Sequence, residues 1–233
     1  MTTTYIVLGM ARSGTSLCAG LLNIIDVNMD YTLGKPDFYA PKGYYESGDA
    51  NAINQKIYEL AWNGRRNYPN DGNSYYWYPP LWTDVRQQAE SIAGHIRAFA
   101  ARHAVYPKWG FKNPATCLTL ELYLSHLDNP RFVVSQRNFE ENLTVCTHIY
   151  RFDTDYIRSV LTYYQQRLEA VLEAYNFPRI YVHYEDLKND HTVVAEQLAD
   201  FCGVEMTSYR KLLVDKFVVK KQFGVDKYCR GSK

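Results

Sequence analysis

The sequence contains no uninterrupted apolar run of the roughly 20 residues that a membrane-spanning helix needs. The run from Leu17 to Ile25 is far shorter and is interrupted by Asn23. The first apolar run has no basic residues before it and is broken by Arg12, so it does not have the pattern of a signal peptide. We therefore expect a cytoplasmic protein that does not associate with membranes.

Cysteine is scarce and shows none of the spacings that mark a disulfide framework or a zinc site. Only five of the 233 residues are cysteines, the number is odd, and no two of them form a Cys-x-x-Cys pair. Disulfide-rich domains and zinc-binding modules need paired or clustered cysteines. The pattern favours a reducing compartment, and we expect no bound metal.

The chain also lacks an excess of either charge. It has 26 Lys and Arg residues against 25 Asp and Glu residues, which gives a formal net charge of +1 at pH 7. Proteins that bind nucleic acids usually carry a strongly basic surface, so we expect no nucleic-acid partner. Basic residues that serve the function must act locally.

What the sequence does contain is an alternation of strand-like and helix-like segments. Hydrophobic residues make up 46% of the chain, which suits one domain over residues 1–233. Short apolar runs predict strands over residues 4–9, 108–112, 131–136 and 179–184. Helical spacing of apolar residues predicts helices over residues 14–25, 49–62, 84–104, 116–127, 139–150, 155–175 and 192–202. This alternation predicts an α/β fold, a mainly parallel sheet flanked by helices.

One long excursion, residues 30–107, separates consecutive predicted strands. Its beginning lies in residues 26–48, which are rich in Gly, Pro, Asp and Tyr and predict an ordered loop. We expect the excursion to be an inserted segment that covers the mouth of the site. Its aromatic residues either form a lid that stacks against a substrate or pack the insertion itself. They are Tyr68, Tyr75, Tyr76, Trp77, Tyr78 and Trp82.

Residues 5–16, YIVLGMARSGTS, read as a strand that enters a glycine-bounded turn and opens a helix. Gly9 and Gly14 permit a tight turn, and the amino terminus of the helix adds N–H groups suited to one phosphate. The glycine spacing matches the nucleotide loop G-x-x-x-x-G-K-[ST], but Thr15 stands where that loop has lysine. A cation appears three residues earlier, as Arg12. The loop can take one phosphate but lacks the usual apparatus for a triphosphate.

Basic residues follow three of the four predicted strands. They are Arg12, Lys112 and Arg137, whereas the fourth strand leads into Glu185 and Asp186. Ligands of open parallel sheets bind at the carboxyl ends of the strands. The three cations are therefore predicted to converge on one anionic ligand.

Five segments, in this order along the chain, resemble the sulfotransferases that use 3′-phosphoadenosine 5′-phosphosulfate (PAPS). GMARSGTSLCAGLL resembles their 5′-phosphosulfate loop. PKGYYE, at residues 41–46, is followed by Asn54 and Trp62. Together they resemble the segment that follows the loop in bacterial members. The other three segments are WGFKNP, RFVVSQRNFEENLTV and IYVHYEDL. The resemblance implies a P-loop NTPase-like architecture, PAPS as co-substrate, adenosine 3′,5′-bisphosphate as product and no metal.

The resemblance also assigns roles to the residues of the loop. Arg12 would lie beside the transferring sulfuryl group. The 5′-phosphate would be held by Ser13, Gly14, Thr15 and Ser16.

The 3′-phosphate is assigned to Arg137, whose guanidinium can form two parallel hydrogen bonds with a phosphate. The family usually has a serine eight residues after that arginine, and this chain has Val145 there. Thr144, one residue earlier, is the candidate substitute. Asn113 departs from the family in another place, because the family usually has Asp at that position.

Sulfuryl transfer should resemble phosphoryl transfer, in line and with negative charge building on the departing phosphate oxygen. Arg12 and Lys112 are the candidates to stabilise that charge. A base must also accept the proton of the acceptor hydroxyl. Glu46 is the first candidate for the base and His148 the second. The sequence does not choose among small-molecule, carbohydrate and tyrosyl acceptors, and it says nothing about the oligomeric state.

Two other functions stay open. A P-loop kinase or NTPase that has moved its lysine would place Glu185 or Asp186 near magnesium. A non-catalytic nucleotide-binding protein with the same fold would explain the departures at Asn113 and Val145.

Overall fold

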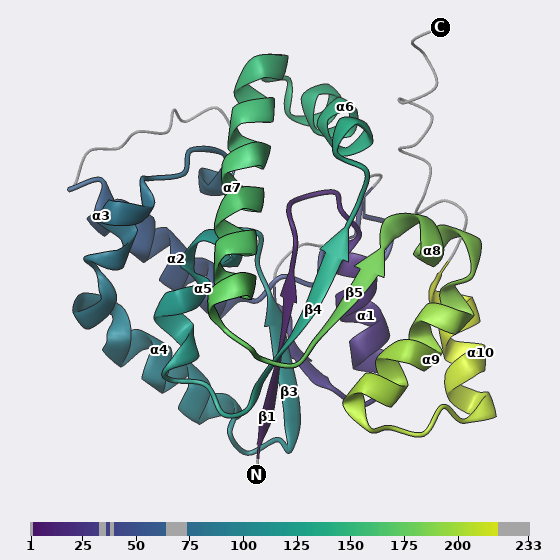
Figure 1. The fold of residues 1–233 in the computed structure, drawn as a ribbon. Coiled ribbons are helices and arrows are strands. Elements are labelled where there is room, and N and C mark those ends of the chain that lie inside the picture. The colour runs from purple at the N-terminus through teal and green to yellow at the C-terminus, as the bar shows by residue number, and fades with distance from the viewer. Residues whose placement is uncertain (1, 33–35, 38–39, 64–73, 219–233) are drawn as a thin grey trace, which may run out of the picture.

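The computed structural model describes residues 2–32, 36–37, 40–63 and 74–218 (Figure 1). At its centre lies a sheet of five parallel strands in the order β2-β3-β1-β4-β5. The strands are β1 (Thr3–Leu8), β2 (Asn28–Asp30), β3 (Lys108–Lys112), β4 (Pro130–Gln136) and β5 (Arg179–His183). The predicted fold class is confirmed, and the four predicted strands are all present.

Helices cover both faces of the sheet, as Figure 1 shows. Alternating side chains of β1 divide the core, because Ile6 and Leu8 pack with one set of helices and Tyr5 and Val7 with the other. The first set is α2 (Gly48–Ala61), α3 (Trp82–Arg86), α4 (Ala89–His103), α5 (Thr116–Leu124), α6 (Phe139–Tyr150) and α7 (Thr154–Ala174). The second set is α1 (Thr15–Ile24), α8 (Tyr184–Asn189), α9 (His191–Cys202) and α10 (Ser208–Phe217). No helix among the described residues is long and apolar enough to cross a membrane.

The structure corrects several predicted elements. The loop predicted over residues 26–48 contains β2, which pairs in parallel with β3 but is too short to give a periodic signal. The single helix predicted over residues 84–104 is two helices, α3 and α4, interrupted at Gln87 and Gln88. Its apolar stripe persists across the break, so periodicity alone could not reveal it. Helices α8 and α10 were not predicted, since α8 has only 6 residues and α10 fully buries only Val214.

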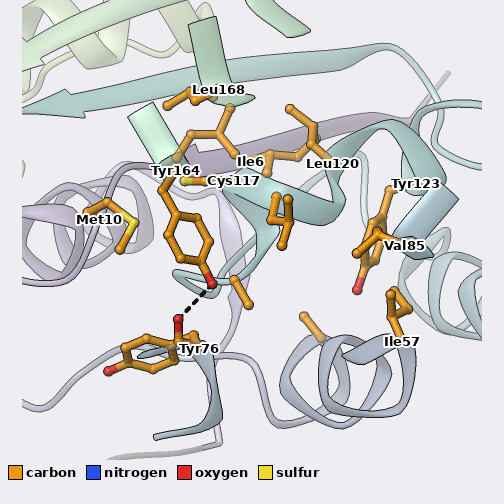
Figure 2. Packing of buried hydrophobic residues seen from close by; sticks show 14 of the residues in the cluster. Ile6, Met10, Ile57, Tyr76, Val85, Cys117, Leu120, Tyr123, Tyr164 and Leu168 are labelled. Atoms are coloured by element: carbon orange, nitrogen blue, oxygen red, sulfur yellow. Dashed lines mark hydrogen bonds between the residues drawn. The ribbon is translucent and has the colours of Figure 1, made fainter. Parts of the chain in front are cut away.

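The aromatic segment of the excursion packs into the core. Tyr75, Tyr76 and Trp77 form a short 3-10 helix in which all three side chains are buried. Figure 2 shows Tyr164 of α7 pointing to this segment, where its hydroxyl donates a 2.8 Å hydrogen bond to the carbonyl of Tyr76. The packing interpretation therefore holds for these three residues. Tyr68 lies outside the described residues.

Asn54 of α2 connects the excursion to the end of β3. Its side chain is fully buried. The amide nitrogen donates to Asn113 Oδ1 at 3.1 Å and Thr116 Oγ1 at 3.0 Å. The amide oxygen accepts from Thr119 Oγ1 at 2.6 Å and Tyr123 Oη at 2.9 Å. The amide thus uses both of its donors and both acceptor sites.

Replacing Asn54 by alanine is expected to lower the free energy of unfolding by about 2–4 kcal/mol, because it leaves buried polar groups without partners. Urea titration followed by circular dichroism measures the change. Lys56→Ala is the control, since Lys56 is exposed on the same helix and such changes usually stay within about 0.5 kcal/mol. Equal stability of the two variants would contradict the role given to Asn54.

Candidate active site

The loop between β1 and α1 has the backbone that its glycines predict. Gly9 and Gly14 have φ angles of 142° and 102°. Residues with a Cβ atom rarely adopt such positive φ angles. A Cβ at Gly9 would lie 2.6 Å from the carbonyl oxygen of Ser135, and one at Gly14 would lie 3.2 Å from the Ser135 hydroxyl. That hydroxyl donates to the carbonyl of Ser13 at 2.7 Å. The glycines therefore let the loop pass close to the end of β4.

A cavity opens beside this loop, at the amino terminus of α1. Gly14, Thr15 and Ser16 line it. Among the described residues no side chain caps the start of α1, so the positive end of the helix dipole faces the cavity without a side-chain partner. The Ser16 hydroxyl donates to the carbonyl of Tyr44 at 2.8 Å. Such a helix start suits a phosphate or sulfate group.

Two of the predicted cations meet at this cavity. Arg12 and Arg137 both line it, and Nη1 of Arg137 donates to the carbonyl of Arg12 at 3.2 Å. The Arg137 guanidinium lies 4.1 Å from the ring centre of Tyr184 and 3.6 Å from a carboxylate oxygen of Glu141. The predicted convergence of strand ends is thus present in the structure for these two residues.

A third basic residue, Lys42, lines the same cavity from the excursion. The pattern of the sequence does not single out Lys42, because it lies in the PKGYYE segment and not at the end of a strand. The described lining of the cavity includes no Asp or Glu residue. The cavity is therefore strongly basic in a chain whose net charge is only +1.

Lys112 and Glu46 form a buried ion pair. Lys112 ends β3 and is only 2% exposed, and its Nζ lies 3.0 Å from Glu46 Oε1. The backbone brings them together, because the N–H of Ser47 donates to the carbonyl of Lys112 at 3.0 Å. Burial lowers the pKa of Lys112, and the carboxylate of Glu46 opposes that shift. Two residues proposed for catalysis from the sequence are therefore direct partners.

Three tyrosines surround Arg12. Burial tends to lower the pKa of Arg12, but the hydroxyls of Tyr150, Tyr44 and Tyr76 more than offset this and raise it above its ordinary value. The hydroxyl of Tyr44 also donates to Asp37 at 2.6 Å. Arg12 therefore carries its charge at every accessible pH. Nothing in the spacing of the sequence signalled that Tyr150 would lie near Arg12.

Other predicted site residues lie elsewhere. Thr144 is exposed on α6, and its hydroxyl donates to the carbonyl of Glu140 at 2.8 Å. Val145 is fully buried in the core. His148 is exposed in the last turn of α6. None of the three is among the described residues that line the cavity.

The acidic pair after β5 lies in the first turn of α8. Glu185 pairs with Lys188 at 3.6 Å. Neither Glu185 nor Asp186 is among the described lining residues. The acids that a magnesium-dependent NTPase would need are thus not gathered at the loop.

Comparisons with known proteins identify the family of the chain and proteins that share its fold. A model of the sulfotransferase family matches residues 5–208. The structure of sulfotransferase STF9 from Mycobacterium avium has a TM-score of 0.55 at 13% identity, covering 93% of this chain and 67% of that one. STF1 from Mycobacterium tuberculosis H37Rv has a TM-score of 0.53 at 14% identity, covering 99% and 77%.

A third similar structure is the sulfotransferase domain of the olefin synthase from Synechococcus PCC 7002. Its TM-score is 0.52 at 17% identity, and the match covers 96% of this chain and 80% of that domain. At such identities the solved structures show the shared fold, and the family model shows the family. No curated protein matches the sequence significantly.

Proposed function

The chain belongs to the sulfotransferase family, and on this premise we propose that it transfers a sulfuryl group from PAPS to a hydroxyl group of an acceptor. The observation that carries the proposal is the cavity beside the β1–α1 loop. Its described lining includes Arg12, Lys42 and Arg137 and no carboxylate. PAPS carries several negative charges, so a cavity of this kind suits it and its product, adenosine 3′,5′-bisphosphate.

The loop and the start of α1 suit the 5′-phosphate. Glycines at positions 9 and 14 let the loop pass close to the end of β4, and the helix start faces the cavity. Thr15 in place of a lysine fits a ligand with one phosphate at this position, because there is no β- or γ-phosphate to neutralise. Arg137 suits the 3′-phosphate, since its side chain is only 1% exposed and lies beside the loop.

Catalysis would rest on fixed charge. During transfer, negative charge develops on the departing phosphate oxygen, and preorganised cations in a site that excludes water stabilise it strongly. Arg12 is the first candidate, because it lines the cavity. Lys112 is the second, and its burial supports the role.

Glu46 is the proposed base for the acceptor hydroxyl. Its carboxylate is held by Lys112 at 3.0 Å, and its side chain is 17% exposed, so that an acceptor can reach it. His148 remains the second candidate, and its exposure on α6 supports it less. The acceptor is a hydroxyl of a small molecule, a sugar or a tyrosyl peptide. The phenols of Tyr44 and Tyr150 near Arg12 suit stacking and hydrogen bonding with any of these.

Binding of the product tests the proposal without knowledge of the acceptor. Isothermal titration calorimetry should show that the wild type binds adenosine 3′,5′-bisphosphate at least 10-fold more tightly than adenosine 5′-monophosphate. Arg137→Ala should remove most of that difference, because a charge-assisted hydrogen bond contributes roughly 1.5–3 kcal/mol. Affinity for the monophosphate should change little.

Arg131→Ala is the matched control, because Arg131 lies near the start of β4, at the end of the strand opposite to Arg137, and donates to the carbonyl of Phe201 in α9. The proposal fails if the wild type does not distinguish the two nucleotides. Thermal stabilisation by ATP that requires magnesium and exceeds that by the bisphosphate would instead favour a kinase or NTPase.

A further inference from the structure

The cavity contains a cation that the family resemblance did not assign, and it lacks a hydroxyl that the resemblance did. We propose that Lys42 binds the 3′-phosphate of the donor and takes the place of the serine that family members usually have at the position of Val145. This inference rests on the proposed function, because it assumes that PAPS is the donor.

Neither of the two candidate positions on α6, 144 and 145, offers a hydroxyl to a phosphate in the cavity. Val145 is fully buried and has no hydroxyl, so the position of the usual serine cannot donate. Thr144 is exposed and its hydroxyl is bonded to the carbonyl of Glu140. Arg137 would then hold a phosphate of about two negative charges while also lying 3.6 Å from the carboxylate of Glu141. A second cation is needed to balance the charge.

Lys42 is placed to supply it. Its segment, residues 40–43, lines the cavity together with Arg137 and the start of α1. The Nζ of Lys42 donates to the carbonyl of Lys216 at 3.3 Å, next to Phe217, another lining residue. Lys42 is therefore held at the side of the cavity where α10 ends.

The present partner of Lys42 does not prevent this role. The bond to the Lys216 carbonyl is long, exposed and made to a neutral acceptor. Charge-assisted hydrogen bonds to phosphate are roughly twice as strong as bonds between neutral groups. A bound 3′-phosphate can therefore replace the carbonyl as the partner of the ammonium group.

The test compares two nucleotides that differ only in the 3′-phosphate. Calorimetric titrations with adenosine 3′,5′-bisphosphate and adenosine 5′-monophosphate, at one ionic strength, should be made on the wild type, Lys42→Ala, Lys42→Arg and Lys216→Ala. Lys42→Ala should weaken bisphosphate binding about 10-fold and monophosphate binding less than about 2-fold. Lys42→Arg should retain most of the affinity. Lys216→Ala is the control, because it removes an equal charge near the cavity from a residue that is not among the described lining residues. It should change neither affinity.

Three results would overturn the role of Lys42. Lys42→Ala could leave both affinities unchanged, it could weaken both by the same factor, or Lys216→Ala could have the same effect as Lys42→Ala. The second result would assign Lys42 to the 5′-phosphate, and the third would reduce it to a general electrostatic contribution. A wild type that binds both nucleotides equally would instead refute the proposed function. Thermal unfolding without nucleotide confirms that the variants are folded, since Lys42 is exposed.

Discussion

Arg12→Ala is expected to lower the kcat of sulfuryl transfer by roughly 100- to 1,000-fold, the usual effect of removing one preorganised group that stabilises charge in the transition state. Arg12 lines the cavity at the loop. The partly buried setting weakens screening by water, so that its charge acts strongly on a nearby oxyanion. Because the surrounding phenols raise its pKa, the effect should be the same across the pH range of the assay.

The measurement is the initial rate of adenosine 3′,5′-bisphosphate release from PAPS, with an acceptor found in a panel of phenols, sugars and tyrosyl peptides. Arg12→Lys should recover part of the rate, because it keeps a charge without the planar guanidinium. Arg151→Ala is a matched control, since Arg151 is exposed and its backbone has a similar left-handed conformation, with φ of 59° against 69° for Arg12. Arg12→Ala within about 3-fold of the wild-type rate would remove Arg12 from the catalytic residues.

The sequence predicted those parts of the site that depend on local pattern and on the topology of parallel sheets. Gly9 and Gly14 could be assigned to a tight turn because their spacing follows a buried strand. Arg12 and Arg137 could be brought together because the carboxyl ends of parallel strands share one edge, and the bond from Arg137 to the carbonyl of Arg12 bears this out. Neither prediction depends on how the excursion folds.

Several contacts that the sequence did not reveal involve the excursion. Lys112 and Glu46 are far apart in the sequence, and their pairing depends on the hydrogen bond between Ser47 and the end of β3. Lys42 reaches the cavity, and Tyr44 reaches Ser16 and Arg12, only because residues 40–44 fold over the start of α1. No periodicity describes such a path, so only the folded structure shows it.

Helix geometry explains why Thr144 is a poor substitute for a residue at position 145. Successive residues of an α-helix are rotated by about 100° around its axis. Val145 accordingly points into the core while Thr144 points to solvent. A shift of one residue along the sequence is small, but on a helix it changes the direction of the side chain completely.

Glu46→Gln is expected to lower the rate of transfer to a hydroxyl acceptor by roughly 100-fold or more, the range typical of a general base. Binding of adenosine 3′,5′-bisphosphate should be unaffected, because Glu46 is not among the described lining residues of that cavity. Steady-state kinetics and calorimetry on the same preparation separate the two effects. Glu141→Gln, which removes a carboxylate beside Arg137, should leave the rate within about 3-fold of wild type. If Glu46→Gln is nearly fully active and His148→Ala is not, His148 is the base.

The same variant also predicts a change in pH dependence, because Glu46 stabilises the charge on Lys112. Burial lowers the pKa of Lys112 and the carboxylate of Glu46 raises it, so that removing the carboxylate lowers the pKa further. If transfer requires the protonated lysine, activity is lost as pH rises through that pKa. The alkaline limb of the rate profile should therefore lie at lower pH in Glu46→Gln than in the wild type. If the alkaline limb of the Glu46→Gln profile lies at the same pH as that of the wild type, the charge of Lys112 does not govern the transfer step. Arg12 alone would then neutralise the departing phosphate.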